Sequence, residues 1–194
     1  MVQGTVRGSL QSRIYKALVE NRNPAWGLLL EKRAAMFRAA DGGEFTTWHF
    51  SGEMLRAWPM ASQSLGLSNV MIVIKSWTNA WCTTTRYHEA QIWPCIFGCR
   101  GCRDSLKHYL NCPHFWSGVC SQEWAHVDPV VRLGLEEPTT LRLKWIVVAS
   151  RVYHTIKFSH RMELETAISA GSFGRIRKIS RILAAHFRQE MGIT

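Results

Sequence analysis

Four of the chain's six cysteines lie between residues 95 and 112, and a histidine lies among them. These residues are Cys95, Cys99, Cys102, His108 and Cys112. Thiolate and imidazole groups are preferred ligands of Zn2+, which takes four of them in a tetrahedron when its role is structural. We recognise no secretory signal in the first twenty residues, so we expect thiols rather than disulfides. Clustered thiols in a reducing compartment predict a structural zinc site, in preference to ordinary buried cysteines beside a core histidine.

The residues within and after the cluster predict how it folds. Gly98 permits a tight turn that supplies one edge of the tetrahedron. Asp104-Ser105 can cap a short helix, and on its face His108 and Cys112 lie one turn apart. Pro113 is expected to end that helix. The opposite edge of the tetrahedron is therefore expected from this helix.

The cluster holds one ligand more than a zinc ion needs. Spacing alone slightly favours Cys102 over Cys95, because two residues between paired cysteines is the commoner turn. The set would then be Cys99, Cys102, His108 and Cys112, close to the spacing of a retroviral-type zinc knuckle. His114 is a weaker reserve. The residues alone leave the choice between Cys95 and Cys102 open.

The order of these residues is similar to a known pattern. The string consists of Cys99, Asp104-Ser105, His108 and Cys112-Pro113. It resembles the zinc-binding segment downstream of the polymerase domain in non-LTR retrotransposon reverse transcriptases, over residues 68–115, and similar strings are expected in retroelement-derived reading frames of dinoflagellates. The resemblance implies that Cys95 is the first ligand, with one residue more before the second than the family's usual two. It favours a Cys3His set of Cys95, Cys99, His108 and Cys112, with Cys102 in reserve.

Apolar periodicity predicts a mainly α fold, a helical domain in which the cluster forms a small Cys3His zinc-knuckle-like insert. Helices are expected over 10–40, from Ser68 to Trp81, over 139–156 and after Gly174, with a short strand at 45–50 as one interpretation of an ambiguous stretch. Ser68 and Thr139 are the expected caps. We divide the chain into an N-terminal helical region of unknown role (1–66), a helix with the zinc-binding segment (67–120) and C-terminal basic amphipathic helices (121–194).

Apolar residues on the expected helices are assigned to the core. Trp77 and Trp81 fall at helical spacing beside Val70 and Ile74, so we expect them in the core rather than stacked on nucleic-acid bases. In the long helix over 139–156, the apolar face consists of Leu141, Trp145, Val148, Val152 and Ile156.

The chain is strongly basic. Its 24 Lys and Arg residues against 14 Asp and Glu give a net charge of +10, and residues 139–194 alone carry ten basic residues against three acidic ones. Such an excess favours an anionic partner. The residues expected to contact RNA or DNA are Arg100, Arg103 and Lys107 beside the cluster, and Arg177, Arg181 and Arg188 on the last helix.

No catalytic constellation accompanies these features. The chain lacks the Tyr-x-Asp-Asp signature of a polymerase and the spaced carboxylates of an endonuclease or RNase H, so we expect no enzyme and no small-molecule substrate. We predict a non-catalytic, zinc-binding, nucleic-acid-binding module derived from a retrotransposon reverse transcriptase. The alternative is a structural or interaction subunit that reuses this fold in a protein or ribonucleoprotein assembly. No membrane span is expected, and the nucleus or cytoplasm is favoured, with an organelle as the alternative.

Overall fold

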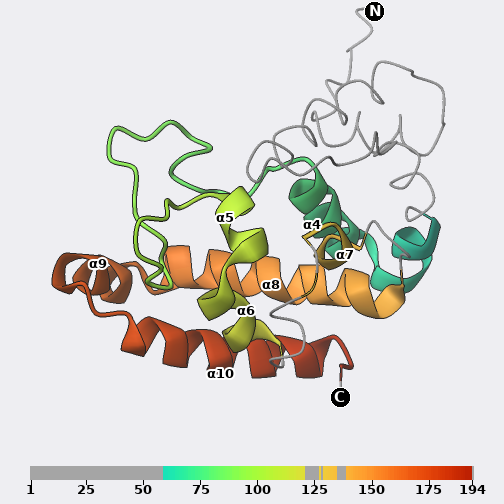
Figure 1. The fold of residues 1–194 in the computed structure, drawn as a ribbon. Coiled ribbons are helices and arrows are strands. Elements are labelled where there is room, and N and C mark those ends of the chain that lie inside the picture. Colours follow the sequence, from blue (N-terminus) through green and yellow to red (C-terminus); the bar gives the residue numbers. More distant parts are fainter. Residues whose placement is uncertain (1–58, 121–126, 128, 135–138, 194) are drawn as a thin grey trace, which may run out of the picture.

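A computed structural model describes residues 59–120, 127, 129–134 and 139–193. Residues 59–65 are helical, and the named helices are α4 (Leu67–Trp77), α5 (Leu106–Asn111), α6 (Pro113–Val119), α7 (Pro129–Arg132), α8 (Thr140–Ser159), α9 (Arg161–Ala170) and α10 (Gly174–Glu190) (Figure 1). The described residues contain no strand, only an isolated antiparallel bridge. This confirms the mainly α fold. The helix expected over 10–40 and the strand at 45–50 lie outside the described residues.

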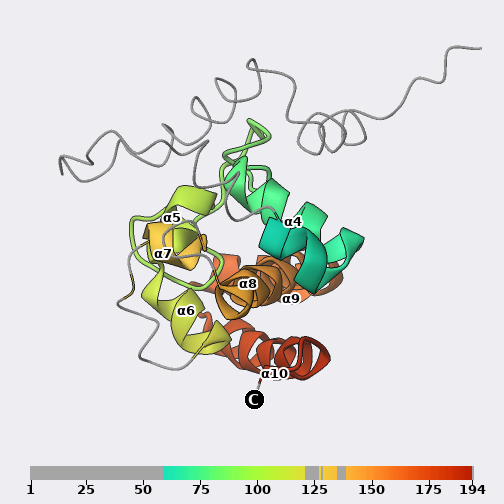
Figure 2. The same cartoon turned by 90° about the vertical axis from the view of Figure 1, so that its right-hand side faces the viewer.

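Helix α8 is the central element, with α4 and α10 on opposite sides of it (Figure 2). Thr139 caps it as expected, because its side chain accepts a hydrogen bond from the backbone N–H of Arg142. The predicted apolar face is buried except for Leu141, which is 49% exposed in the first turn. Residues on other faces, such as Val147, are buried too. Helix α8 is therefore packed on several sides, more deeply than one apolar stripe predicts.

Helix α4 differs from the expectation at both ends. It begins at Leu67 after Gly66, so Ser68 lies inside the helix and does not cap it. It ends at Trp77, and Trp81 lies beyond a turn rather than on the helix. Both indoles are nevertheless buried, as predicted. Trp77 donates through Nε1 to the carbonyl of Leu133 at 2.7 Å, so this ring is held in the core and is not free to stack on a base.

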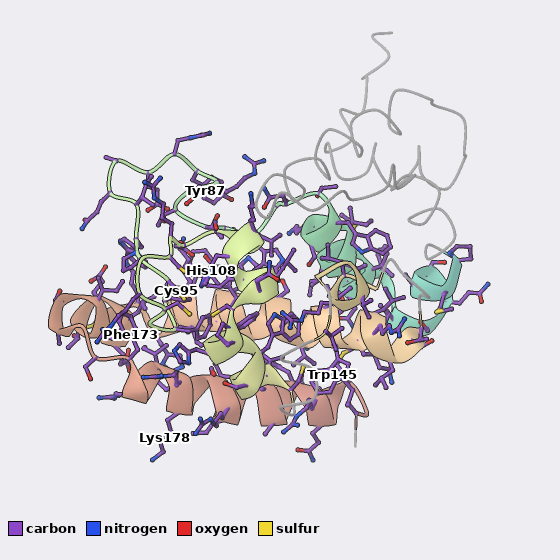
Figure 3. All side chains as sticks on the ribbon, in the orientation of Figure 1. Tyr87, Cys95, His108, Trp145, Phe173 and Lys178 are labelled. Carbon is purple, nitrogen blue, oxygen red and sulfur yellow. The ribbon has the colours of Figure 1, made fainter. Side chains whose placement is uncertain are left out.

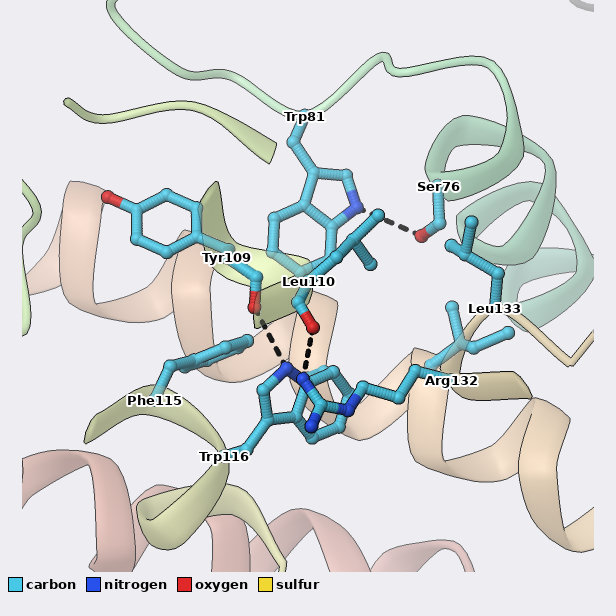
Figure 4. A pocket seen from close by; sticks show the side chains of 10 residues that line it. Ser76, Trp81, Tyr109, Leu110, Phe115, Trp116, Arg132 and Leu133 are labelled. Atoms are coloured by element: carbon cyan, nitrogen blue, oxygen red, sulfur yellow. Dashed lines mark hydrogen bonds between the residues drawn. The ribbon is translucent and has the colours of Figure 1, made fainter. Parts of the chain in front are cut away.

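Figure 4 shows the side chains that line a small space between α4, α5, α6, α7 and α8. Trp81 donates to Ser76 Oγ at 2.9 Å, and Trp116 donates to the carbonyl of Tyr109 at 2.8 Å. The guanidinium of Arg132 lies 5.1 Å from the Trp116 ring centroid and donates to the carbonyl of Leu110. The space left among them is about 10 Å³, at most one water molecule, so this is core and not a ligand site.

The C-terminal helices close the fold over the cysteine segment. The chain turns between α9 and α10 at Gly171, which has a φ of +62° and ends α9, shortly before the helix that the sequence predicts after Gly174. Helix α10 then packs against α8 and α6. The approach to α6 is close, because a Cβ placed on Gly118 would overlap Ser180 Oγ. One hydrophobic core thus includes residues from α4, the cysteine segment and the C-terminal helices.

Candidate metal centre

A short hairpin carries the first half of the cysteine cluster. Its two arms are joined by the bridge between Pro94 and Arg103, and by a backbone hydrogen bond from Cys95 N to Cys102 O at 2.8 Å. At the tip, Gly98 N donates to Cys95 O at 2.9 Å, and Gly98 has a φ of +87°. Glycine adopts this left-handed conformation without the penalty that a side chain brings. The expected turn at Gly98 is therefore present.

The second half of the cluster lies on α5 and at its junction with α6. Ser105 caps α5 as predicted, with its hydroxyl accepting from His108 N at 3.2 Å. Cys112 both follows α5 and caps α6, and its Sγ accepts from Phe115 N at 3.4 Å. Helix α5 ends at Asn111, so Pro113 does not simply stop a helix but occupies the first position of the next one.

Ligand atoms of Cys95, Cys99, His108 and Cys112 all lie within 4.8 Å of one another. Cys112 Sγ lies 3.8 Å from Cys95 Sγ and 3.4 Å from Cys99 Sγ. A tetrahedron with Zn–S bonds of about 2.3 Å has edges of about 3.8 Å, whereas a disulfide needs about 2.05 Å. Figure 3 shows His108 and Cys95 near one another, between the hairpin and α5. The cluster therefore has the size of a tetrahedral metal site.

Burial supports the same interpretation. Cys95 and Cys112 are fully buried, while Cys99 and His108 are half-buried. His108 Nε2 is buried and has no hydrogen-bond partner among the described residues. A buried nitrogen without a partner is costly, and a metal ion is one group that compensates a buried imidazole. The four residues can hold a metal ion such as zinc.

The two reserve ligands lie outside this group. Cys102 is half-buried and contributes its carbonyl to the hairpin, and His114 is half-buried in the first turn of α6. In the described part of the chain, the ligand atoms that lie within 4.8 Å of one another belong to Cys95, Cys99, His108 and Cys112. Cys102 is not in this group. The choice that spacing left open is thus made by the hairpin geometry.

The three thiols influence one another's protonation. The pKa of Cys95 is lowered to about 4, chiefly because Cys112 donates a hydrogen bond to its sulfur, with help from His108. Burial raises the pKa of Cys99 to about 11, and the pKa of Cys112 is also raised, chiefly by the hydrogen bond that it makes to Cys95. Without metal the cluster therefore favours one thiolate and two thiols. Binding a divalent ion would release the remaining protons.

A buried carboxylate holds the cluster segment onto α8. Asp104 Oδ1 accepts from the hydroxyls of Tyr109 (2.7 Å) and Tyr153 (2.9 Å), and Oδ2 accepts from Thr84 N (2.7 Å). Lys157 Nζ lies 3.2 Å from Oδ2 and also donates to the carbonyl of Cys82. Burial, followed by the negative charge of Asp104, raises the pKa of both tyrosines, which keeps them neutral donors.

Sequence analysis missed this role of Asp104. The residue was interpreted as part of a helix cap, but its side chain lies in the core and Ser105 alone caps the helix. The available signal was Lys157, a basic residue one turn after Tyr153 on a largely apolar helix, because a cation on a buried face needs an anionic partner. The sequence has 14 acidic residues, and their spacing does not reveal which of them is the anionic partner of Lys157, because the pair is a tertiary contact.

Gly98 gives a direct test of the hairpin and its contact with the C-terminal helices. A Cβ on Gly98 would lie 2.6 Å from Cδ2 of Phe173, the residue before α10. We expect Gly98→Ala to lower the free energy of unfolding by about 2–4 kcal/mol, through left-handed backbone strain and overpacking. Gly101→Ala is the matched control: its φ is +70°, but no atom lies within 4 Å, so only the backbone cost of about 1–2 kcal/mol applies. Urea unfolding of both variants measures these free energies. Equal losses of unfolding free energy in the two variants would contradict the contact between Gly98 and Phe173.

The predicted nucleic-acid contacts lie in two groups. Arg100 and Arg103 are exposed on the hairpin, and Lys107 is half-buried on α5. On α10, Arg181 is exposed while Arg177 and Arg188 are half-buried. Among the described residues, none of the six forms an ion pair with an acidic side chain. Their positive charges are therefore not neutralised by a described carboxylate.

The arginines of α10 are not equivalent in position. Arg177 lies one turn after Phe173, which packs on the hairpin tip, so of the three arginines predicted to bind on α10 it is the nearest in sequence to that contact. Arg188 lies eleven residues further on, about 16 Å along the helix axis, where its charge lowers the pKa of Cys120 against the larger effect of burial. A single phosphate therefore cannot contact both.

No family model, no curated protein and no solved structure matches the chain. In the part of the chain that the structure describes, no helix is long and apolar enough to cross a membrane. Evidence on function therefore comes from the cluster, the hairpin and the distribution of charge.

Proposed function

We propose that the cluster binds one Zn2+ ion with a structural role. The observation that supports this most strongly is the convergence of three sulfurs and one imidazole nitrogen to within 4.8 Å. Three thiolates with one imidazole suit zinc and do not suit Mg2+ or Ca2+, which prefer oxygen ligands. Four protein ligands leave no position for a reactive water, so the ion would do no chemistry. It would fix the hairpin relative to α5.

We further propose that the chain binds nucleic acid through the hairpin that the metal would fix. The net charge of +10 and the exposed Arg100 and Arg103 on the hairpin support an anionic partner. The similarity of residues 68–115 to the zinc-binding segment of non-LTR retrotransposon reverse transcriptases points in the same direction. A rigid turn that presents basic side chains is suited to phosphate contacts, which position a protein on a strand without reading its sequence.

Metal analysis and salt-dependent binding test this function together. Purified protein should hold about one zinc per chain. A labelled single-stranded oligonucleotide should bind with an affinity that falls as salt rises. Replacing both Arg100 and Arg103 with glutamine should reduce the slope of log K against log salt by about 1.4, which corresponds to two lost phosphate contacts on a single strand.

The control removes the same charge elsewhere. Lys75 on α4 is exposed, and changing it to glutamine should leave the slope nearly unchanged, whereas Arg100→Gln alone should reduce it by about 0.7. A protein that holds zinc but binds no oligonucleotide at low salt would contradict the nucleic-acid part of the proposal. If such a protein co-purified with a stoichiometric protein partner, the structural-subunit alternative would replace it.

A further inference from the structure

A hollow of about 260 Å³ opens beside the cluster, between the turn that follows α4 and the start of α5. Its lining residues are Asn79, Thr83, Thr85, Arg86, His88, Ser105, Leu106 and Lys107. The lining therefore combines two permanent cations, three hydroxyls, an amide and an imidazole with no carboxylate. This chemistry suits an anion that accepts several hydrogen bonds.

The two cations are available to such an anion. Arg86 donates through Nε to the carbonyl of Asn79 at 3.1 Å, which fixes the direction of its side chain and leaves its two terminal amino groups for a ligand. Among the described residues, neither Arg86 nor Lys107 forms an ion pair with an acid. A guanidinium held in one direction binds a phosphate through two parallel hydrogen bonds at little entropic cost.

The hydroxyls are placed by backbone contacts. Thr83 Oγ1 accepts from Arg86 N at 3.1 Å and Ser105 Oγ accepts from His108 N at 3.2 Å, so each keeps its proton to donate. Thr85 Oγ1 is buried and has no hydrogen-bond partner among the described residues. Thr85 lines the hollow, so a small rotation of its side chain toward an occupant would give this hydroxyl the partner that it lacks.

We propose that this hollow binds one backbone phosphate of the nucleic-acid strand; the inference rests on the nucleic-acid function proposed above. Arg86, Thr85 and Lys107 would contact this phosphate. Arg86 and Thr85 are not among the contacts predicted from the sequence. Ser105, the cap of α5, and Lys107 in its first turn lie three residues and one residue before the proposed ligand His108, so the metal would also fix this wall of the hollow. The bound phosphate would then lie next to the hairpin that carries Arg100 and Arg103.

The test compares three variants of the zinc-loaded full chain, using the same labelled oligonucleotide. Arg86→Gln should lower the slope of log K against log salt by about 0.7, the value for one lost phosphate contact. Thr85→Val keeps the charge and shape, and should weaken binding by about tenfold with the slope unchanged, as expected for a lost hydrogen bond to a charged group. Lys75→Gln removes one exposed charge from α4 and should change neither quantity appreciably.

Each contrary outcome is distinguishable. If Arg86→Gln and Thr85→Val bind like the unmodified chain while Arg100 and Arg103 variants lose affinity, the hollow proposal fails and the nucleic-acid function stands. If the amide NMR signals of Thr85 and Arg86 shift with millimolar inorganic phosphate but not with the oligonucleotide, the site takes a free phosphate and the strand proposal is overturned. If the unmodified chain binds no oligonucleotide and inorganic phosphate shifts no signal, both proposals fall. Melting curves of each variant show whether a loss reflects unfolding instead.

Discussion

Replacing Cys112 with serine is expected to release the metal and to disorder the segment that the metal holds. Cys112 Sγ lies within 3.8 Å of two other proposed ligands, and the residue is fully buried between α5 and α6. Structural zinc sites contribute about 10–16 kcal/mol of apparent binding free energy, which is coupled to folding. Serine cannot supply a thiolate, so zinc per chain should fall from about one to near zero.

The effect should be confined to part of the molecule. Helices α4, α8 and α10 share apolar contacts that do not involve the metal, so most of the far-ultraviolet circular dichroism should persist. The near-ultraviolet signal should fall, because Trp81 packs against Tyr109 and Phe115, next to the cluster. Removing the metal from the unmodified chain with a chelator should reproduce both changes.

Two cysteine controls make the result specific. Cys120→Ser alters a buried thiol outside the cluster, whose pKa burial raises to about 12, and should leave the zinc content unchanged. Cys102→Ser should also keep the zinc, whereas Cys95→Ser should lose it. The reverse result, with zinc lost from Cys102→Ser and retained by Cys95→Ser, would show that the other ligand set is used. Full native spectra after chelation would contradict a structural metal altogether.

Residue spacing predicted the type of this site but left its membership open, whereas the resemblance favoured the four residues that the structure brings together. Residue chemistry and short spacings indicated a Cys3His cluster, a turn at Gly98 and a cap at Ser105, all of which are local features. The choice between Cys95 and Cys102 is not local. Both lie on facing arms of the hairpin, and only the pairing of those arms and the docking of α5 decide which sulfur comes near Cys112.

The helices show the same division between local and tertiary causes. Periodicity and the Thr139 cap predicted α8, but not the burial of several of its faces, because a helix between two others has no single solvent side. Trp81 was assigned to α4 by its spacing, yet the chain turns after Trp77, at Asn79 with a φ of +51°. The turn brings the Trp81 indole to Ser76 Oγ and into the aromatic core. Helical spacing predicted its burial correctly but not its position.

The contact between Asp104 and Lys157 joins residues 53 positions apart and provides the second large prediction. Asp104→Asn nearly preserves shape but removes the charge that compensates the buried Lys157 ammonium. Removing one partner of a buried ion pair costs about 3–5 kcal/mol, and the described partner that remains for Lys157 is Glu89, a weaker one because it is 42% exposed and lies 3.9 Å from the ammonium. We therefore expect urea unfolding to show a loss of that size, at unchanged m-value.

An exposed ion pair and a double variant separate the buried charge from other causes. Glu165→Gln breaks the ion pair between Glu165 and Arg161. The side chain of Arg161 is 65% exposed and that of Glu165 is 50% exposed, and such exposed pairs contribute about 0.2–1 kcal/mol to stability. Combining Asp104→Asn with Lys157→Met removes both buried charges, so it should recover much of the stability that the single substitution loses. If the double variant is no more stable than Asp104→Asn alone, the loss must come from the hydrogen bonds of Tyr109 and Tyr153 to the carboxylate, not from the uncompensated lysine.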